Sequence, residues 1–230
     1  MSRAGGFVVR HDRTTVVGAL ARPWPDPAVR SVWFVEIDRP TLVLGSTQPS
    51  AVVDHGRAEA AGVEIVRRRS GGGAVLLEPG ETVWADVFIP ADDPLAVADV
   101  GRAFAWVGQA WARALGDVGV HPGVSVHEGR PRSSAWSAAV CFAGLGPGEV
   151  TVDGAKAVGI SQRRTKAGSL FQCGALVAWD PVPLLDLLAL SDDERSAAAL
   201  DLGPVATGTG VPPARLVAAF EGALNDSCPP

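Results

Sequence analysis

The chain contains few lysines and few cysteines, and it has no long apolar run. Only two of its 20 basic residues are lysine, Lys156 and Lys166. No apolar run approaches the roughly 18 residues of a membrane-spanning helix, and residues 1–6 lack the apolar core of a signal peptide. Three widely spaced cysteines argue against a disulfide framework and suit a reducing compartment. These absences predict a cytoplasmic protein that does not act at a membrane.

Charge and length further restrict the class of protein and the number of domains. The net charge of −5 at pH 7 gives no general electrostatic reason to bind nucleic acid or an anionic membrane. Apolar residues make up 47% of the chain and charged residues 20%, as in soluble globular proteins. The 230 residues are enough for one sizeable core, and neither internal repeats nor a low-complexity linker divides them. We therefore expect a single domain over residues 1–230.

The pattern of apolar residues predicts the secondary structure. Residues 1–30 have little periodicity and three prolines, so we expect an irregular lead-in. The strand-like segments are residues 31–37, 41–45, 63–66, 82–89, 149–152, 155–160 and 169–179. The helix-like segments are residues 54–61, 92–116, 181–190 and 213–224. This order predicts an α+β fold, a mixed β-sheet flanked by helices.

The longest predicted helix begins at Asp92 or Asp93 and ends at Gly116. Its apolar stripe is Val100, Phe104, Val107, Trp111 and Leu115. Aromatic residues at helical spacing usually pack in the core, so we expect Trp106 and Trp111 to be core residues rather than ligand platforms. The following residues, 117–139, are rich in Gly, Pro and Ser, a composition from which a flap over a site can form.

Residues 67–75 form the least ordinary stretch of the chain, because three arginines run into three glycines. Gly71–Gly73 allow close approach of the backbone to a ligand and positive φ angles, so that successive N–H groups can face one acceptor. Arg68 and Arg69 can add charge-assisted hydrogen bonds to a carboxylate or phosphate. A glycine-rich turn with solvated arginines is an equally good interpretation of this stretch alone. It is neither a Walker loop nor a Rossmann fingerprint, since no helix pattern follows it.

Lys156 and Cys141 are the other candidates for chemistry. Lys156 follows Asp153-Gly154, a strong signal for a two-residue hairpin turn. An exposed strand lysine is the ordinary interpretation, and a cation that stabilises an acyl or phosphoryl oxygen is the functional one. A free cysteine is most often a small buried hydrophobe, but positive groups near Cys141 would favour a nucleophilic thiolate. Cys173, within a predicted strand, is more readily explained as a core residue.

Two motifs together resemble the catalytic domain of lipoate-protein ligases and octanoyltransferases. The first is residues 41–45 with Gln48, followed by residues 62–75, GVEIVRRRSGGGAV. The second is residues 153–164, DGAKAVGISQRR. The resemblance covers about residues 40–190. It implies a fold shared with biotin-protein ligases and attachment of an octanoyl or lipoyl group to a lysine of a lipoyl carrier domain.

The resemblance also implies roles for individual residues. Lys156 is similar to the family's catalytic lysine, and Cys141 to the cysteine of the Gram-positive type of octanoyltransferase, which forms a thioester without ATP. The residues that the resemblance places at the substrate are Arg68, Arg69, Ser70, Gly71, Gly72, Gly73, Ala74, Gly159 and Gln172; no metal ligand is assigned. Two family histidines are replaced, at Leu77 and at Cys173. Gly148-Glu149 stands where ligases have an Asn-Asp pair, which disfavours adenylation.

Three hypotheses follow. The first is an acyltransferase that takes octanoyl from an acyl-carrier protein onto Cys141 and passes it to a lipoyl-domain lysine, with no cofactor. The second is an ATP-dependent lipoate-protein ligase, which would need ATP and Mg²⁺. The third is a diverged, non-catalytic protein that binds an acyl group or a carrier protein. We weigh the first most heavily.

Overall fold

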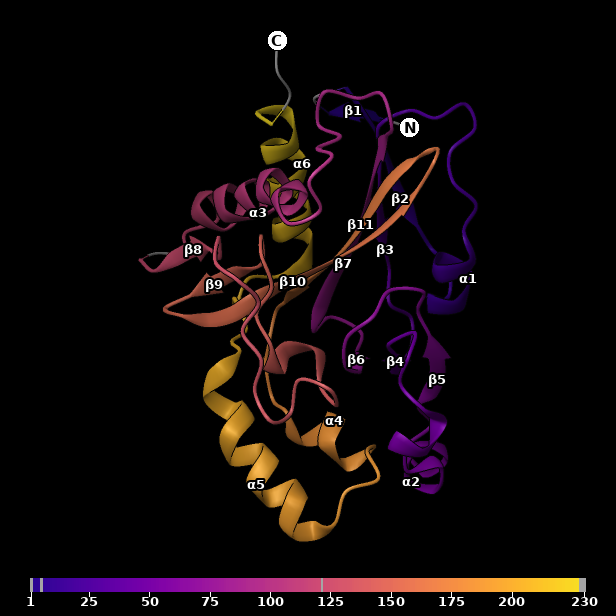
Figure 1. The fold of residues 1–230 in the computed structure, drawn as a ribbon, viewed down its shortest axis with the longest axis vertical. Helices are drawn as coiled ribbons and strands as arrows, with labels where there is room; N and C mark the ends of the chain where they lie inside the picture. Colours follow the sequence, from indigo (N-terminus) through magenta and orange to yellow (C-terminus); the bar gives the residue numbers. More distant parts are fainter. Residues whose placement is uncertain (1, 5, 121, 228–230) are drawn as a thin grey trace.

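The computed structural model describes residues 2–4, 6–120 and 122–227, which form two β-sheets with helices around them (Figure 1). The larger sheet has eight strands among these residues, in the order β1-β2-β3-β7-β11-β10-β9-β8. Their bounds, in that order, are Ser2–Ala4, Phe7–Asp12, Ser31–Val35, Thr82–Pro90, Gly168–Leu176, Ala155–Thr165, Val150–Val152 and Val124–Val126. β2 and β3 are parallel and the other neighbours antiparallel, so the predicted mixed sheet is confirmed.

The smaller sheet has β4 (Thr41–Leu44) in its centre, between β5 (Glu64–Arg67) and β6 (Val75–Leu77). β4 is parallel to β5 and antiparallel to β6. The arginine-glycine stretch is therefore the connection that carries the chain from one edge of this sheet to the other. All four residues of β4 are buried, which fits the continuous apolar character of a central strand.

Six α-helices of the described chain pack around the sheets. They are α1 (Val16–Ala21), α2 (His55–Ala60), α3 (Ala105–Asp117), α4 (Val182–Asp186), α5 (Asp192–Leu202) and α6 (Pro213–Asn225). α3 and α6 lie against each other beside the large sheet (Figure 1). Between them, the Trp111 ring stacks on Phe220 at 3.9 Å between centroids. Trp111 is fully buried and Trp106 packs against the same core, so their prediction as core residues is confirmed.

Two local predictions are confirmed by backbone geometry. Asp153 and Gly154 have φ angles of 50° and 85°, the two successive positive values of a tight hairpin turn between β9 and β10. The carboxylate of Asp54 accepts a hydrogen bond from the N–H of Arg57 and so caps α2.

The prediction of an irregular lead-in over residues 1–30 is wrong for its first part. β1, β2 and α1 occupy most of residues 2–21. β2 lies parallel to β3 with Phe7 and Val9 buried, and Thr15 caps α1 by accepting from the N–H of Gly18. Each element is too short for its periodicity to stand out, and pairing with the large sheet supplies the stability that the local sequence does not.

The predicted helix over residues 92–116 begins too early, because α3 starts at Ala105 after a short 3₁₀ turn, η2 (Arg102–Phe104). Asp93 accepts instead from the N–H of Leu95 and pairs with Arg30 at 2.5 Å, so it anchors a turn. Val100 is 59% exposed and does not belong to the apolar stripe. α3 is therefore no longer than α6, since each helix has 13 residues.

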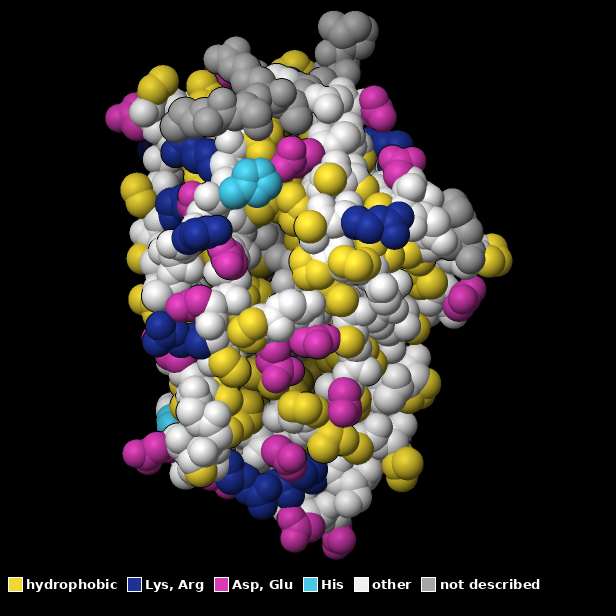
Figure 2. Space-filling view, turned by 180° about the vertical axis from the view of Figure 1, so that it is seen from behind, with side chains coloured by type: hydrophobic (Ala, Val, Ile, Leu, Met, Phe, Trp, Pro, Cys, Tyr) yellow, Lys and Arg dark blue, Asp and Glu magenta, His cyan; other side chains and the backbone are white. Residues whose placement is uncertain are grey.

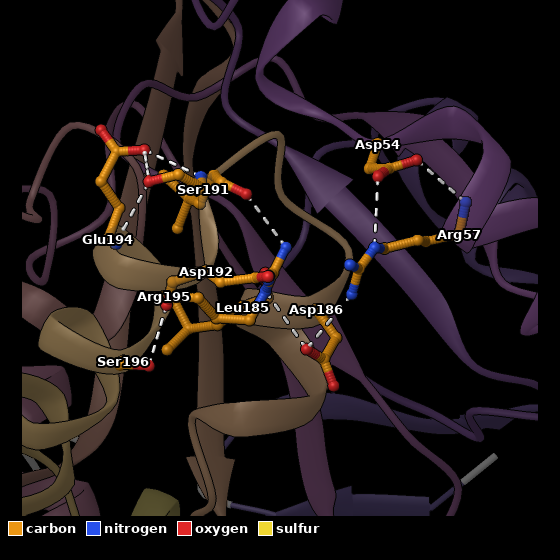
Figure 3. A network of polar contacts seen from close by, with 10 residues as sticks. Asp54, Arg57, Leu185, Asp186, Ser191, Asp192, Glu194, Arg195 and Ser196 are labelled. Carbon is orange, nitrogen blue, oxygen red and sulfur yellow. Dashed lines mark hydrogen bonds and ion pairs between the residues drawn. The ribbon is translucent and has the colours of Figure 1, made fainter.

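α5 is a helix that the apolar pattern did not predict. Ser191 and Glu194 cap it reciprocally, each side chain accepting from the other residue's N–H. Arg195 on α5 pairs with Asp186 at the end of α4 at 3.2 Å, and Asp186 also lies 3.7 Å from Arg57 of α2 (Figure 3). The Ser-x-x-Glu signature of this capping box is present in the sequence. The apolar pattern did not reveal α5 because the helix is largely polar and its Leu200 is 81% exposed.

The outer surface in the view of Figure 2 carries basic and acidic side chains interspersed with apolar ones, without a broad patch of one sign. Among the described residues, no helix combines the length and apolar character needed to cross a membrane.

Candidate active site

The connection between β5 and β6, residues 68–74, is called the glycine loop below. A cavity of about 330 Å³ lies where this loop, β7, β10 and β11 meet the segment around Cys141. Its volume is at the lower end of the range usual for small-ligand sites, roughly 300–1,000 Å³. Its apolar part includes Leu20, Val43, Leu77 and Trp84, which pack as one cluster. Its polar part contains Cys141, Glu149 and Lys156. The cavity is therefore apolar on one part of its wall and reactive on another.

The glycine loop is shaped by Arg68 from within. Arg68 is buried, and its guanidinium donates to the carbonyl oxygens of Gly71 at 2.7 Å and Gly73 at 2.8 Å. A longer bond of 3.3 Å reaches the carbonyl of Val43 on β4. Arg68 borders the cavity, but these hydrogen bonds serve to hold the loop in shape.

The loop glycines allow contacts that a side chain would block. A Cβ atom on Gly73 would lie 2.5 Å from backbone atoms of Val140, next to Cys141. A Cβ on Gly45 would lie 1.9 Å from the carbonyl oxygen of Gly72, whose own φ is +96°. The N–H groups of Gly71, Gly72 and Gly73 donate to no group in the described part of the chain. The loop thus presents free backbone donors beside the cysteine segment.

Cys141 begins a short 3₁₀ turn, η3 (Cys141–Ala143), that is tied to the glycine loop. Its N–H donates to the carbonyl of Ala74 at 2.8 Å, and the N–H of Ala74 donates to Ala139 at 2.8 Å. Gln48 adds a third tie, because its side-chain amide donates to the carbonyls of Ala138 and Ala139. The half-buried thiol of Cys141 is held at the cavity wall by these bonds.

Lys156 lies on β10 and is only 3% exposed. Its ammonium group donates to the carbonyl oxygens of Cys141 at 3.2 Å and Gly144 at 3.0 Å. It also forms an ion pair of 2.8 Å with Glu149. The ring centroid of Phe142 lies 4.9 Å from the same nitrogen. Lys156 is a buried, fully paired cation, and the exposed strand lysine considered in the sequence is excluded.

Glu149 is held as firmly as Lys156. Its carboxylate accepts from the N–H of Gly146 at 2.6 Å and from the N–H of Ile160 at 3.0 Å, in addition to the ion pair. Gly148 before it has φ +79°, and a Cβ there would lie 2.3 Å from Phe104, so no larger side chain fits. Residues 148–149 present one carboxylate, and it points at Lys156.

Cys173 differs from Cys141 although both border the cavity. Its residue is 1% exposed and packs with the core under α3 and α6. Burial raises the pKa of its thiol to about 12, and the nearby carboxylate of Asp86 acts in the same direction. A thiol in such surroundings is inert, as expected for a core cysteine. Cys228 lies outside the described residues.

The described histidines lie outside the cavity lining. His11 pairs with Glu221 at 2.9 Å, His55 contacts Ser50, and His127 contacts the carbonyl of Arg130. His121 lies outside the described residues. Leu77 and Cys173, at which the resemblance implied replaced histidines, both line the cavity.

The predicted substrate-binding residues separate into two groups in space. Arg68, Gly71, Gly72, Gly73, Gly159 and Gln172 line the cavity together with Cys141 and Lys156. Ser70 lies behind the loop and accepts from the hydroxyl of Ser161 at 3.1 Å, and Ala74 is fully buried. Arg69 is exposed and borders a separate hollow beside Trp33 and Arg163. The fit of Arg69 to a substrate in the main cavity is therefore poor.

Sequence reasoning gave no role to Glu149 or Gln48. Gln48 stood in the first motif and Glu149 at a position where ligases have an acidic residue, so each had a signal. Neither signal said what the side chain would contact, because the fold brings Gln48 to the carbonyls of Ala138 and Ala139 and folds Glu149 back onto Lys156.

A buried carboxylate, Asp86, lies behind the apolar part of the cavity. It accepts from Trp84 at 2.7 Å and from Gln172 at 3.3 Å, and it pairs with Arg22 at 3.0 Å. Burial raises the pKa of Asp86 to about 6, against the lowering effect of these three partners. Arg22 also binds Asp12 at 2.7 Å, which connects the end of α1 to the large sheet.

Comparison with known proteins identifies the class to which this fold and site belong. Residues 25–201 match the model of the lipoyl protein ligase A/B catalytic domain, and the chain belongs to that family. The bipartite lipoate protein ligase of Thermoplasma acidophilum, from a structural analysis of that ligase and its E2 lipoyl domain, has a similar fold. The TM-score is 0.73 over 98% of this chain and 84% of that one, at 16% identity.

Curated relatives are octanoyltransferases named LipM. The protein from Exiguobacterium sp. is 27% identical over 175 residues, which cover 70% of this chain and 62% of the relative. The protein from Carboxydothermus hydrogenoformans is 33% identical over 145 residues, which cover 63% of this chain and 51% of the relative. The chain therefore matches about half to three fifths of the length of these relatives.

Proposed function

We propose that the protein transfers octanoyl or lipoyl groups to the lysine of a lipoyl carrier domain through a thioester on Cys141. The observation that carries this proposal is the half-buried thiol fixed beside a buried ammonium group and a loop of unpaired backbone N–H groups. A nucleophile, a nearby cation and preorganised donors are the components of acyl transfer. The similarity to LipM octanoyltransferases supports the same assignment.

The reaction would proceed in two steps. The Cys141 thiolate attacks the carbonyl carbon of an acyl thioester, a C–S bond forms, and the donor thiol leaves and takes up a proton. The lysine amine of the carrier domain then attacks the new thioester, a C–N bond forms, and Cys141 leaves as thiolate while the amine loses a proton to solvent. In each step the carbonyl oxygen becomes an oxyanion.

The glycine loop and Lys156 have different roles in this scheme. The free N–H groups of Gly71–Gly73 can donate to the oxyanion without giving up another bond. Lys156 already donates to three acceptors and is paired with Glu149, so its contribution is to hold the segment of Cys141 in place through the carbonyls of Cys141 and Gly144. The apolar part of the cavity, with Leu20, Val43, Leu77 and Trp84, would hold the acyl chain.

The test is the intact mass of the protein after incubation with an octanoyl thioester. We expect a gain of about 126 Da that Cys141→Ala abolishes and Cys173→Ala retains. Hydroxylamine should remove the adduct, as it does other thioesters. An unchanged mass with bound ligand would favour the non-catalytic hypothesis, and AMP formation from octanoate and ATP that survives Cys141→Ala would favour a ligase.

A further inference from the structure

A second hollow of about 320 Å³, called the side hollow below, adjoins the main cavity. Val75, Thr82 and Phe142 line both, so the two spaces share part of their walls. The rest of its lining is largely apolar and includes Leu176 and Trp179. The Trp179 ring lies 5.8 Å from that of Phe142 between centroids, and its indole N–H donates to the carbonyl oxygen of the last residue of α5 at 3.1 Å. The side hollow therefore has an apolar wall that is held in place.

The side hollow adjoins the nucleophile as well as the cavity. Cys141 lines the main cavity and precedes Phe142 in η3. It also packs against the apolar cluster that contains Phe142, Leu176 and Trp179, three residues that line the side hollow. A ligand in the side hollow therefore contacts the same residues as Cys141.

The charged residues of the side hollow are three carboxylates, Glu78, Glu81 and Asp180, and no described Lys, Arg or His lines it. None of the three forms an ion pair with a described residue. Partial burial raises the pKa of Glu78, and the negative charges of Glu81 and Asp180 raise it further. The three carboxylates thus repel one another, and a bound cation would relieve this repulsion.

The main cavity carries the opposite sign of charge. Its Lys156 is paired with Glu149, and its buried Arg68 has no carboxylate partner among the described residues. A lysine amine has a pKa of about 10.4 and is therefore protonated at neutral pH. Such a group is repelled by the wall of the main cavity and attracted by the side hollow. Its four-carbon stem also fits an apolar wall, because lysine buries its methylene groups while its charge stays at a polar rim.

We propose that the side hollow is the binding site for the acceptor lysine of the carrier domain: Glu78, Glu81 and Asp180 attract its ammonium group, and Leu176 and Trp179 contact its methylene groups. This inference rests on the proposed acyl transfer and gives its second substrate a place of its own. The acyl donor occupies the main cavity. The amine loses its proton to solvent before it attacks, so the three carboxylates bind the acceptor and take no part in forming the thioester.

The test compares two acceptors for the octanoyl group on Cys141: the cation Nα-acetyl-lysine methylamide and the uncharged thiol N-acetylcysteamine. Glu78→Gln, Glu81→Gln and Asp180→Asn together should raise KM for the lysine acceptor about tenfold and leave kcat within about twofold, because charge-assisted contacts are lost from binding. Octanoylation of Cys141 and transfer to the thiol should each change less than about twofold. An equal loss with both acceptors, or no loss with the amine, would overturn the inference.

A matched triple variant controls for net charge. Glu59→Gln, Asp117→Asn and Asp226→Asn remove the same charge from exposed positions that line neither hollow. We expect KM for the lysine acceptor to stay within about twofold of wild type. A tenfold rise here as well would mean that overall charge attracts the acceptor, and the side hollow would lose its assigned role.

Wild-type protein decides the matter even if the variants fail to fold. In titrations followed by NMR without an acyl donor, Nα-acetyl-lysine methylamide should bind at least about tenfold more tightly than its uncharged norleucine analogue. Equal affinities would contradict the inference. Because no turnover is needed, this preference without an octanoyl adduct on Cys141 would contradict the proposed function alone, and an adduct without this preference would contradict the inference alone.

Discussion

The polar and apolar parts of the cavity are built in different ways. Around Lys156, every polar group is fixed by hydrogen bonds to backbone atoms of several segments. Around Leu77 and Trp84, the wall is set by packing between α1, the small sheet and β7. Hydrogen bonds fix positions to within tenths of an ångström, whereas packing fixes volume. The polar part is thus suited to chemistry and the apolar part to the selection of an acyl chain.

The sharpest test of this difference is the reactivity of the two cysteines. We expect iodoacetamide at pH 8 to modify Cys141 in the native protein and to leave Cys173 unmodified, and to modify both in urea. A thiol with a pKa of about 12 is ionised in only about one molecule in ten thousand at that pH, and Cys173 is buried as well. Peptide mass mapping gives the sites. Modification of Cys173 in native Cys141→Ala protein would contradict the expected difference in reactivity between the two cysteines.

Lys156→Met should have the next largest effect. It leaves the Glu149 carboxylate buried without its cation, which destabilises proteins by about 3–5 kcal/mol. Acyl transfer should fall about 10²-fold, because Lys156 holds the carbonyls of Cys141 and Gly144 and so positions the nucleophile. Replacing both partners, Lys156→Met with Glu149→Gln, removes the unpaired charge and keeps an acceptor for the backbone N–H groups that Glu149 binds. It should restore most of the free energy of unfolding but not the activity. Urea unfolding measures the change in stability, and adduct formation measures the change in activity. Equal stability of the single and the double variant would show that Lys156 and Glu149 do not form a buried ion pair.

Gly73→Ala tests how the glycine loop positions the nucleophile. The added Cβ would lie 2.5 Å from the backbone of Val140 and must displace the segment that carries Cys141. We expect the rate of adduct formation to fall about 10²-fold, because a displacement of about 1 Å at a reacting group has an effect of this size. Gly71→Ala is the local control: a Cβ there meets nothing within 4 Å, so the rate should change no more than a few-fold.

Leu77→Phe tests the apolar part of the cavity. The larger ring removes space from the wall, so we expect the preference for octanoyl over hexanoyl donors to fall about tenfold, the effect usual for one or two methylene groups in an apolar pocket. Thiol release with donors of six, eight and ten carbons gives the preference. An unchanged ratio would show that the chain does not reach Leu77.

The smallest predicted effect is a pH dependence from Asp86. Its pKa is raised from 3.8 to about 6 by burial, so the folded protein holds this proton more tightly than the unfolded chain. The contribution of Asp86 to stability is therefore fully present below pH 4 and is lost as the pH rises to about 6. Asp86→Asn cannot titrate, so the difference in free energy of unfolding, wild type minus variant, should decrease between pH 4 and 7. Urea unfolding across this range checks the sign.

The sequence predicted most of the fold through local signals. Asp153-Gly154, the cap at Asp54 and the stripe through Trp111 each specify structure within a few residues. The structure confirms the turn, the cap and the stripe from Val107 to Leu115. Residues 2–21 could not be predicted in this way, because β1, β2 and α1 are short and depend on pairing with the large sheet. The capping box of α5 was available but was outweighed by weak apolar periodicity.

By itself the sequence determined the two motifs, most of the strands and helices, and Cys141 and Lys156 as the reactive candidates. Only the tertiary structure decided which side chains meet. It paired the ammonium group of Lys156 with the carboxylate of Glu149, directed the guanidinium of Arg68 to carbonyl oxygens of its own loop and placed Arg69 outside the cavity. It also buried Cys173 and left Cys141 accessible. Burial and hydrogen-bond partners depend on segments far apart in the chain, such as Gln48 and Ala139, which are 91 residues apart, and no local pattern encodes such contacts.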